Sequence, residues 1–223
     1  MEKVNQAVKA SRSYGQFCAL ARSLDVVGDR WTLLIVRELL PGPLRYTELK
    51  TSLEGIATNL LATRLRTLEE HGIVERRLED AGVAYGLTPW GEGLREPMEA
   101  LGRWGAPLLA SGRGDDAFQP RWLTLALPAL LRGVTASPPV ELGIDTDGFR
   151  MVLRLDEDGP RAFVRPEDEP EALLTATPDV IVALAAGGLT VKQALATAEF
   201  TGDRRILRTV FAAGRATAAP VRN

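Results

Sequence analysis

The apolar residues of the first half of the chain recur at helical spacing, in segments that turn residues separate. Leu20, Leu24 and Val27 lie three or four positions apart, as on one face of a helix. The segment 31–40 is apolar nearly all round, which is typical of a helix at the centre of a small domain. The pattern predicts helices over 19–27, 31–40, 44–53 with Thr47 as N-cap, and 57–71 with Thr58 as N-cap.

Strand-forming residues follow the fourth of these helices. IVERRL at 73–78 and VAYGL at 83–87 flank the turn-forming, acidic stretch 79–82, which predicts a hairpin. Thr88-Pro89 then provides an N-cap and a proline in the first turn of a helix expected over 90–109. Three helices, a turn, a fourth helix and a hairpin, in this order, are the winged variant of the helix-turn-helix.

The helix predicted over 57–71 has two different faces. Leu61, Leu65 and Leu68 form its inner stripe, whereas Asn59, Thr63 and Arg66 fall on the other side, and their side-chain types reach base edges and phosphates from a helix in the major groove. Taken alone, such a face is more often only solvated. The order of the surrounding elements favours the DNA-binding interpretation.

The second half predicts strands followed by helices, an α+β arrangement. The expected fold class is therefore a winged helix-turn-helix domain followed by an α+β domain, with boundaries at 1–110, a linker over 111–120, and 121–223. The expected elements are a helix over 121–134, strands over 139–145, 149–156, 161–166 and 173–177, and helices that begin at Pro178, Thr190 and Asp203, the last ending near 213.

Composition narrows the class of protein. The apolar share of 45% and charged share of 25% indicate a folded chain, and the net charge of −2 requires any DNA-binding surface to gather its cations locally. With Cys18 and His71 as the single cysteine and histidine, a structural zinc site or a catalytic triad is not expected. We expect no enzyme, no catalytic residue, no cofactor and no metal.

No apolar run approaches the roughly 18 residues that cross a bilayer, and the first residues do not resemble a secretion signal. A cytoplasmic protein that does not bind membranes is expected.

The stretch from Cys18 to Trp104 resembles the HxlR family of bacterial winged-helix regulators, through DRWTLLIVRELLPGPLRYTELKTSLEGIATNLLATRLRTLEEHGIVERR and YGLTPWGEGL. The resemblance implies a homodimer paired through terminal helices, a roughly palindromic double-stranded DNA operator, and a wing at the minor groove. We expect the dimer interface to include Phe17, Leu20, Leu101 and Trp104. The expected DNA-binding residues, with Arg45 and Lys50 as phosphate contacts, are Arg45, Lys50, Thr58, Asn59, Thr63, Arg64, Arg66, Arg76 and Arg77.

Two of these assignments leave alternatives open. Arg64 lies at the flank of its helix, where it pairs either with phosphate or with Glu48 or Glu69. Arg76 and Arg77 alternate along a strand, so only one of them is expected to point toward DNA. The sequence does not decide which.

The second half resembles the sterol-carrier-protein fold, chiefly through EALLTATPDVIVALAAGGLTVKQALATAEFTGDRRILRTVFA. The resemblance implies a helix-covered sheet around an apolar tunnel, and hence a hydrophobic small-molecule ligand that modulates DNA binding. Two alternatives stay open: a dimerisation or packing module, and a lipid-binding protein whose winged domain makes protein contacts.

Cys18 is a candidate redox residue. The resemblance to the HxlR family implies this, because many members keep a cysteine near this point and in some of them it acts as a redox switch; in addition, Cys18 precedes a helix with Arg22 one turn on. The alternative is that Cys18 has no redox role and serves only as a small apolar residue. The four tryptophans are interpreted as core or dimer packing, and His71 as a partner of a helix C-terminus.

Overall fold

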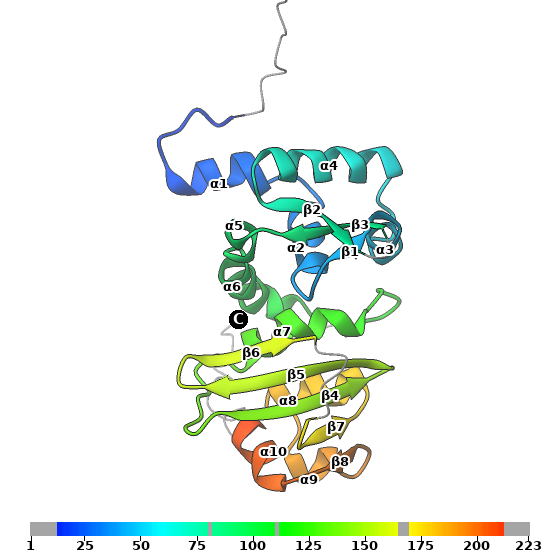
Figure 1. Ribbon diagram of the computed structural model, residues 1–223. Helices are drawn as coiled ribbons and strands as arrows, with labels where there is room; N and C mark the ends of the chain where they lie inside the picture. Colours follow the sequence, from blue (N-terminus) through cyan, green and yellow to red (C-terminus); the bar gives the residue numbers. More distant parts are fainter. Residues whose placement is uncertain (1–12, 80–81, 110–111, 165–169, 212–223) are drawn as a thin grey trace, which may run out of the picture. The chain divides into compact units, whose positions relative to one another are not determined.

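The computed structural model describes residues 13–79, 82–109, 112–164 and 170–211 (Figure 1). The chain divides into two compact units. The N-terminal unit runs to Glu92 without Leu40–Gly42, and the C-terminal unit comprises Leu40–Gly42 and the chain from Gly93 onward. Parts of three predicted elements lie outside the described residues: the hairpin tip at 80–81, the end of the strand expected over 161–166, and the end of the last helix.

The N-terminal unit contains the predicted helices and hairpin. Its sheet has the strand order β1-β3-β2, with all neighbours antiparallel. Its elements are α1 (Ala19–Val27), α2 (Thr32–Leu39), β1 (Leu44–Arg45), α3 (Tyr46–Ser52), α4 (Thr58–Glu70), β2 (Val74–Glu79), β3 (Gly82–Leu87) and α5 (Pro89–Glu92).

Two predicted helix starts are wrong. Leu44 and Arg45 form a strand that pairs with Tyr85 and Ala84 of β3, so α3 begins only at Tyr46 and Thr47 lies inside it. The backbone N–H of Arg45 donates to the Glu48 carboxylate at 2.7 Å instead. The N-cap position of α4 belongs to Ala57, and Thr58 is the first helical residue. Two-residue strands leave almost no trace in hydrophobic spacing.

The core of the N-terminal unit consists mainly of apolar residues of α2, α3 and α4 and of the turns that follow α3 and α4. Gly72, with a φ of 66°, ends α4 in the left-handed conformation that glycine adopts without strain. The chain then turns directly into β2. The largest fully buried side chains of this unit are Ile35, Leu39, Leu49, Leu53, Ile56, Leu61, Leu65, Leu68 and Ile73.

The single helix predicted over 90–109 is also wrong. It is divided into α5, α6 (Arg95–Gly105) and the 3-10 turn η1 (Ala106–Leu109). The predicted cap is confirmed, since the N–H of Gly91 donates to Thr88 Oγ1 at 3.1 Å. α5 lies so close to the start of the hairpin that a Cβ on Gly91 would collide with the carbonyl oxygen of Ile73. α6 packs instead on α7 in the C-terminal unit, so the division falls earlier in the chain than the expected linker.

The C-terminal unit is a five-stranded sheet with helices, as an α+β domain requires. Its strand order is β6-β5-β4-β7-β8, in which β7 runs parallel to β4 and every other neighbouring pair is antiparallel. Besides α6, its elements are η2 (Pro120–Trp122), α7 (Leu123–Leu130), β4 (Val140–Thr146), β5 (Phe149–Asp156), β6 (Gly159–Phe163), β7 (Leu173–Thr175), α8 (Pro178–Ala185), α9 (Val191–Ala194), β8 (Glu199–Thr201) and α10 (Arg204–Phe211).

The predicted starts of the last two helices are confirmed. Thr190 Oγ1 accepts from the backbone N–H of Gln193 at 3.2 Å, and the Asp203 carboxylate accepts from the backbone N–H of Arg205 at 2.8 Å. The helix expected over 121–134 is shorter than predicted. It contains Pro128, which cannot donate a backbone hydrogen bond, and ends at Leu130.

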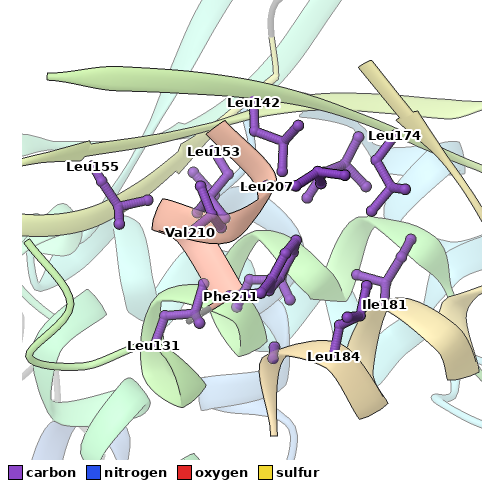
Figure 2. Packing of buried hydrophobic residues seen from close by; sticks show 14 of the residues in the cluster. Leu131, Leu142, Leu153, Leu155, Leu174, Ile181, Leu184, Leu207, Val210 and Phe211 are labelled. Atoms are coloured by element: carbon purple, nitrogen blue, oxygen red, sulfur yellow. The ribbon is translucent and has the colours of Figure 1, made fainter. Parts of the chain in front are cut away.

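One apolar cluster joins the sheet of the C-terminal unit to its helices. Figure 2 shows Leu207, Val210 and Phe211 of α10 between residues of the sheet, such as Leu153, and residues of the helical side, such as Ile181 of α8 and Leu131, which directly follows α7. The C-terminal unit therefore has a core of its own. In the described part of the chain, none of the helices has the length and apolar character that a bilayer crossing demands.

We predict that Gly91→Ala destabilises the N-terminal unit by about 1–3 kcal/mol, because the new methyl group meets fixed backbone at Ile73. Gly102→Ala, in α6, is the control: apart from its chain neighbours and the nearby backbone of its own helix, no described atom lies within 4 Å of the added Cβ, and removing a helical glycine stabilises by about 0.5–1 kcal/mol. Urea unfolding measures both, and equal effects of the two changes would contradict the close contact.

Candidate functional site

Three polar side chains of α4 point away from the core. Asn59, Thr63 and Arg66 are exposed, whereas the leucines of the inner stripe are at most 1% exposed. Within the described chain, the side chains of Asn59 and Arg66 have no hydrogen bond or ion pair with another residue. The Thr63 hydroxyl donates to the carbonyl oxygen of Asn59 at 2.8 Å, which leaves its lone pairs and its methyl group for other contacts. We call these three residues the outer face of α4.

Polar contacts hold α4 at three places. Arg64 Nη1 donates to Asp29 Oδ2 in the turn between α1 and α2, and Arg76 Nε of β2 lies 2.8 Å from Glu69 Oε1. At the start of the helix, the Tyr46 hydroxyl donates to the carbonyl oxygen of Thr58 at 2.7 Å. Figure 1 shows the helix running along the hairpin strand β2. These contacts fix the helix without using the outer face.

Two further cations of the unit, Arg45 and Lys50, lie outside α4. Arg45 is exposed on β1, and Lys50 is half-buried in the last turn of α3. Neither forms an ion pair with a residue that the structure describes. Their charges are available to an anionic partner.

The two wing arginines both have partners within the unit. Arg76 bonds to Glu69, which raises its pKa above the ordinary value, and its guanidinium lies 5.6 Å from the centre of the Tyr85 ring. Arg77 donates to Glu75 at 2.9 Å and to the carbonyl oxygen of Leu87 at 2.8 Å. Neither arginine is free to reach a phosphate without giving up these contacts.

The four residues predicted for dimerisation are all exposed, two in the N-terminal unit and two in the C-terminal unit. Phe17 and Leu20 lie at α1, and Leu20 is 68% exposed. Leu101 and Trp104 lie on α6, where Trp104 is 75% exposed. Such side chains are usually covered when a protein is in its working assembly. Trp90 is also exposed, so core packing does not describe it or Trp104.

Cys18 is exposed and immediately precedes α1. Arg22, one turn later, hydrogen-bonds to Ser13 Oγ at 3.2 Å and lies 3.6 Å from Asp25 Oδ2. The positive charge that the sequence suggested for the thiol is therefore shared with an acid. His71 follows the end of α4, where it was expected.

Sequence reasoning missed the residues that orient α4. Asp29 and Tyr46 lie on other elements, and the partners that the sequence suggested for Arg64 were Glu48 and Glu69. No spacing rule connects positions 29 and 64, because the contact depends on the packing of α4 against the turn before α2. Among the described residues, no group of three potential ligands could hold a metal ion.

Helices α1 to α4, followed by the hairpin β2–β3 and packed around one core, define the winged helix-turn-helix class of DNA-binding domains. The chain belongs to the HxlR-like helix-turn-helix family, whose family model matches residues 26–112.

Curated relatives agree with this family. An uncharacterised HTH-type transcriptional regulator of Synechocystis is 33% identical over 98 residues, which are 43% of this chain and 73% of the relative. The regulator YtfH of Escherichia coli is 31% identical over 104 residues, 45% of this chain and 82% of the relative. The solved structure of reduced YodB, a transcriptional regulator from Bacillus subtilis, is 31% identical and covers 44% of this chain and 99% of that one, with a TM-score of 0.38.

We predict that Asp25→Ala releases the segment that carries Phe17, because it removes the side-chain acceptor. Asp25 accepts from the backbone N–H of Tyr14 at 2.8 Å, and this bond is the main cause that lowers the pKa of Asp25. A lowered pKa means that the contact is fully present above about pH 4, the ordinary range of an aspartate, and is lost as pH falls through the lowered value. Hydrogen exchange at the Tyr14 amide is the measurement, and unchanged protection in Asp25→Ala would contradict the contact.

Proposed function

We propose that this chain is a sequence-specific, DNA-binding transcription regulator that acts as a homodimer and places α4 in the major groove of each half-site. The observation that carries the proposal is the outer face of α4, whose polar side chains are exposed while the helix is fixed from behind. Its family supports it, because regulators of this type bind DNA. No enzymatic reaction is proposed, and a DNA-binding role in a bacterium implies the cytoplasm.

The chemistry of the outer face suits base recognition. An arginine such as Arg66 reads guanine with two hydrogen bonds, an asparagine such as Asn59 reads adenine in the same way, and the Thr63 methyl group fits against a thymine methyl. Arg45 and Lys50 supply phosphate contacts, which fix register without reading sequence. The wing contributes less, because Arg76 and Arg77 already have partners.

The exposed apolar residues of α1 and α6 support dimerisation. Regulators of this type are usually dimers. A two-fold dimer sets its recognition helices about 34–36 Å apart, one turn of DNA, and so implies a palindromic operator. Burial of Phe17, which precedes α1, of Leu20 in α1, and of Leu101 and Trp104 in α6 between subunits removes four large exposed apolar side chains from water.

We further propose that a hydrophobic small molecule binds in the C-terminal unit and modulates DNA binding. The resemblance to the sterol-carrier-protein fold and the helix-covered sheet support this, together with one buried polar group. Thr146 is 1% exposed and, because side chains alternate along a strand, lies on the same side of β4 as the buried Leu142 and Ile144, yet its hydroxyl has no hydrogen-bond partner in the described chain. An apolar ligand with one polar atom would satisfy it. Regulation then requires that the ligand bind the free and the DNA-bound states with different affinities.

A redox role of Cys18 is a second candidate, favoured by the exposure of its thiol. With one cysteine in the chain, a disulfide must join two subunits or capture a small thiol. Peroxide treatment that leaves DNA affinity unchanged and the thiol open to iodoacetamide would exclude this role.

We predict that Arg66→Ala weakens binding to its best DNA sequence by about 1–3 kcal/mol and relaxes the preference for one base pair. Lys50→Ala is expected to weaken all sequences alike and to reduce the salt dependence by about one phosphate contact. Selection from a random DNA pool, followed by salt titration, measures both, with the exposed Arg204→Ala of α10 as control. A uniform loss in Arg66→Ala would make it a phosphate contact.

If the wild-type chain binds no DNA at any salt concentration, the alternative gains support. In that case the chain is a hydrophobic-ligand-binding protein whose winged domain makes protein contacts.

We predict that Thr146→Val lowers the amount of apolar molecule that can be extracted from the purified full chain, because the valine keeps the shape but loses the polar contact. Mass spectrometry of the extract is the measurement. If neither form carries a molecule, the substitution should instead stabilise the protein by about 1 kcal/mol, since it removes an unpaired hydroxyl, and the ligand proposal fails.

A further inference from the structure

Arg64 differs from the other cations of α4 in where its charge is held. Its side chain is 21% exposed, its Nη1 donates to Asp29 Oδ2, and its Nε is buried without a hydrogen-bond partner in the described chain. Arg66, two positions on, is exposed and unpaired there. The helix thus carries one cation turned outward and one turned back against the turn before α2.

The turn that receives Arg64 has a fixed backbone. Trp31 has a φ of 81°, a conformation that bulky residues seldom adopt unless their surroundings impose it. The N–H of Thr32 donates to the carbonyl oxygen of Asp29 at 3.1 Å, and that of Ile35 donates to the carbonyl oxygen of Trp31 at 2.8 Å. The turn is therefore continuous with α2, whose Ile35 is completely buried. The backbone that carries Asp29 is therefore anchored to the core of the unit through α2.

The opposite flank of α4 has a matching contact. Glu69 follows Arg64 by five residues, which is about 140° around a helix with 3.6 residues per turn. There it meets Arg76 of the wing at 2.8 Å. The two ion pairs hold the helix from both sides, and the outer face lies between them. A helix restrained in this way cannot rotate about its axis without breaking one pair.

We infer that Asp29 and Arg64 are positioning residues, which set the rotation of α4 about its axis and so aim Asn59, Thr63 and Arg66, and that Arg64 makes no phosphate contact. The inference rests on the proposed function. It replaces the sequence-based expectation that Arg64 binds DNA directly.

The direction in which Asp29→Asn changes the affinity for DNA distinguishes a positioning role from a purely electrostatic effect. Asp29→Asn removes a negative charge from a surface that meets phosphates and releases the Arg64 guanidinium. If charge alone mattered, DNA binding would become tighter. If the pair positions α4, DNA binding becomes weaker, because the outer face loses its orientation.

The experiment is a double-mutant cycle on the full chain with Asp29→Asn, Arg64→Gln and both together. The dissociation constant of the DNA duplex selected by the wild-type protein is measured over a range of salt concentrations, below the unfolding transition of every variant. We expect each single change to weaken binding by about tenfold, and the double change to be no worse than either one. The salt dependence should equal that of the wild type in all three.

Two results would overturn the inference. One is tighter binding by Asp29→Asn. The other is a salt dependence in Arg64→Gln that falls by about one phosphate contact, as the loss of a direct cation requires. The salt dependence of Arg64→Gln can still be measured if Asp29→Asn does not fold. Absence of salt-dependent binding by the wild-type chain would instead refute the proposed function itself, so the two failures are distinguishable.

Discussion

The burial of one face of α4 is the constraint on which the rest of the N-terminal unit depends. Leu61, Leu65 and Leu68 must leave water, and a helix that buries them in the core turns the opposite side outward. Burial alone determines this direction only loosely, because an apolar stripe tolerates some rotation. The Arg64–Asp29 and Glu69–Arg76 ion pairs restrict the rotation of α4 about its axis further. Packing provides the free energy, and the polar contacts on the flanks provide the direction.

Much of this could be predicted from the sequence, because helical spacing and turn residues are local signals. The spans of α1, α2 and α4, the hairpin and the caps at Thr88, Thr190 and Asp203 depend on such signals. The errors lie where distant parts of the chain decide. β1 forms because β3 is there to pair with it, and the helix expected over 90–109 breaks because α5 seats against Ile73.

In the candidate site too, some features follow from local sequence signals and others depend on distant parts of the chain. The outer face of α4 follows from the pattern of leucines, so the exposure of Asn59, Thr63 and Arg66 could be predicted. The bonds from Arg64 to Asp29 and from Arg76 to Glu69 could not be predicted, because tertiary packing rather than sequence spacing brings these partners together. Counting cations along a helix and hairpin overstates how many are available to DNA. Of the candidate cations, those without an ion pair in the described part of the chain are Arg45, Lys50 and Arg66.

The C-terminal unit poses a different physical question. Its strands and helices enclose a core that needs no contribution from the winged domain, and that core includes one hydroxyl for which packing gives no partner. A chain that only needed a stable second domain would gain from an apolar residue at this position. Thr146 is therefore the residue at which a ligand-binding domain and a purely structural one differ most.

Site-specific photo-crosslinking tests the central claim most directly. A photoreactive residue at position 63, on the outer face of α4, should crosslink to duplex DNA that the full chain selects from a random pool, and one at exposed position 204, on α10, should not. Crosslinks from position 63 to protein alone, with none to DNA, would contradict the account and assign the winged domain to protein contacts.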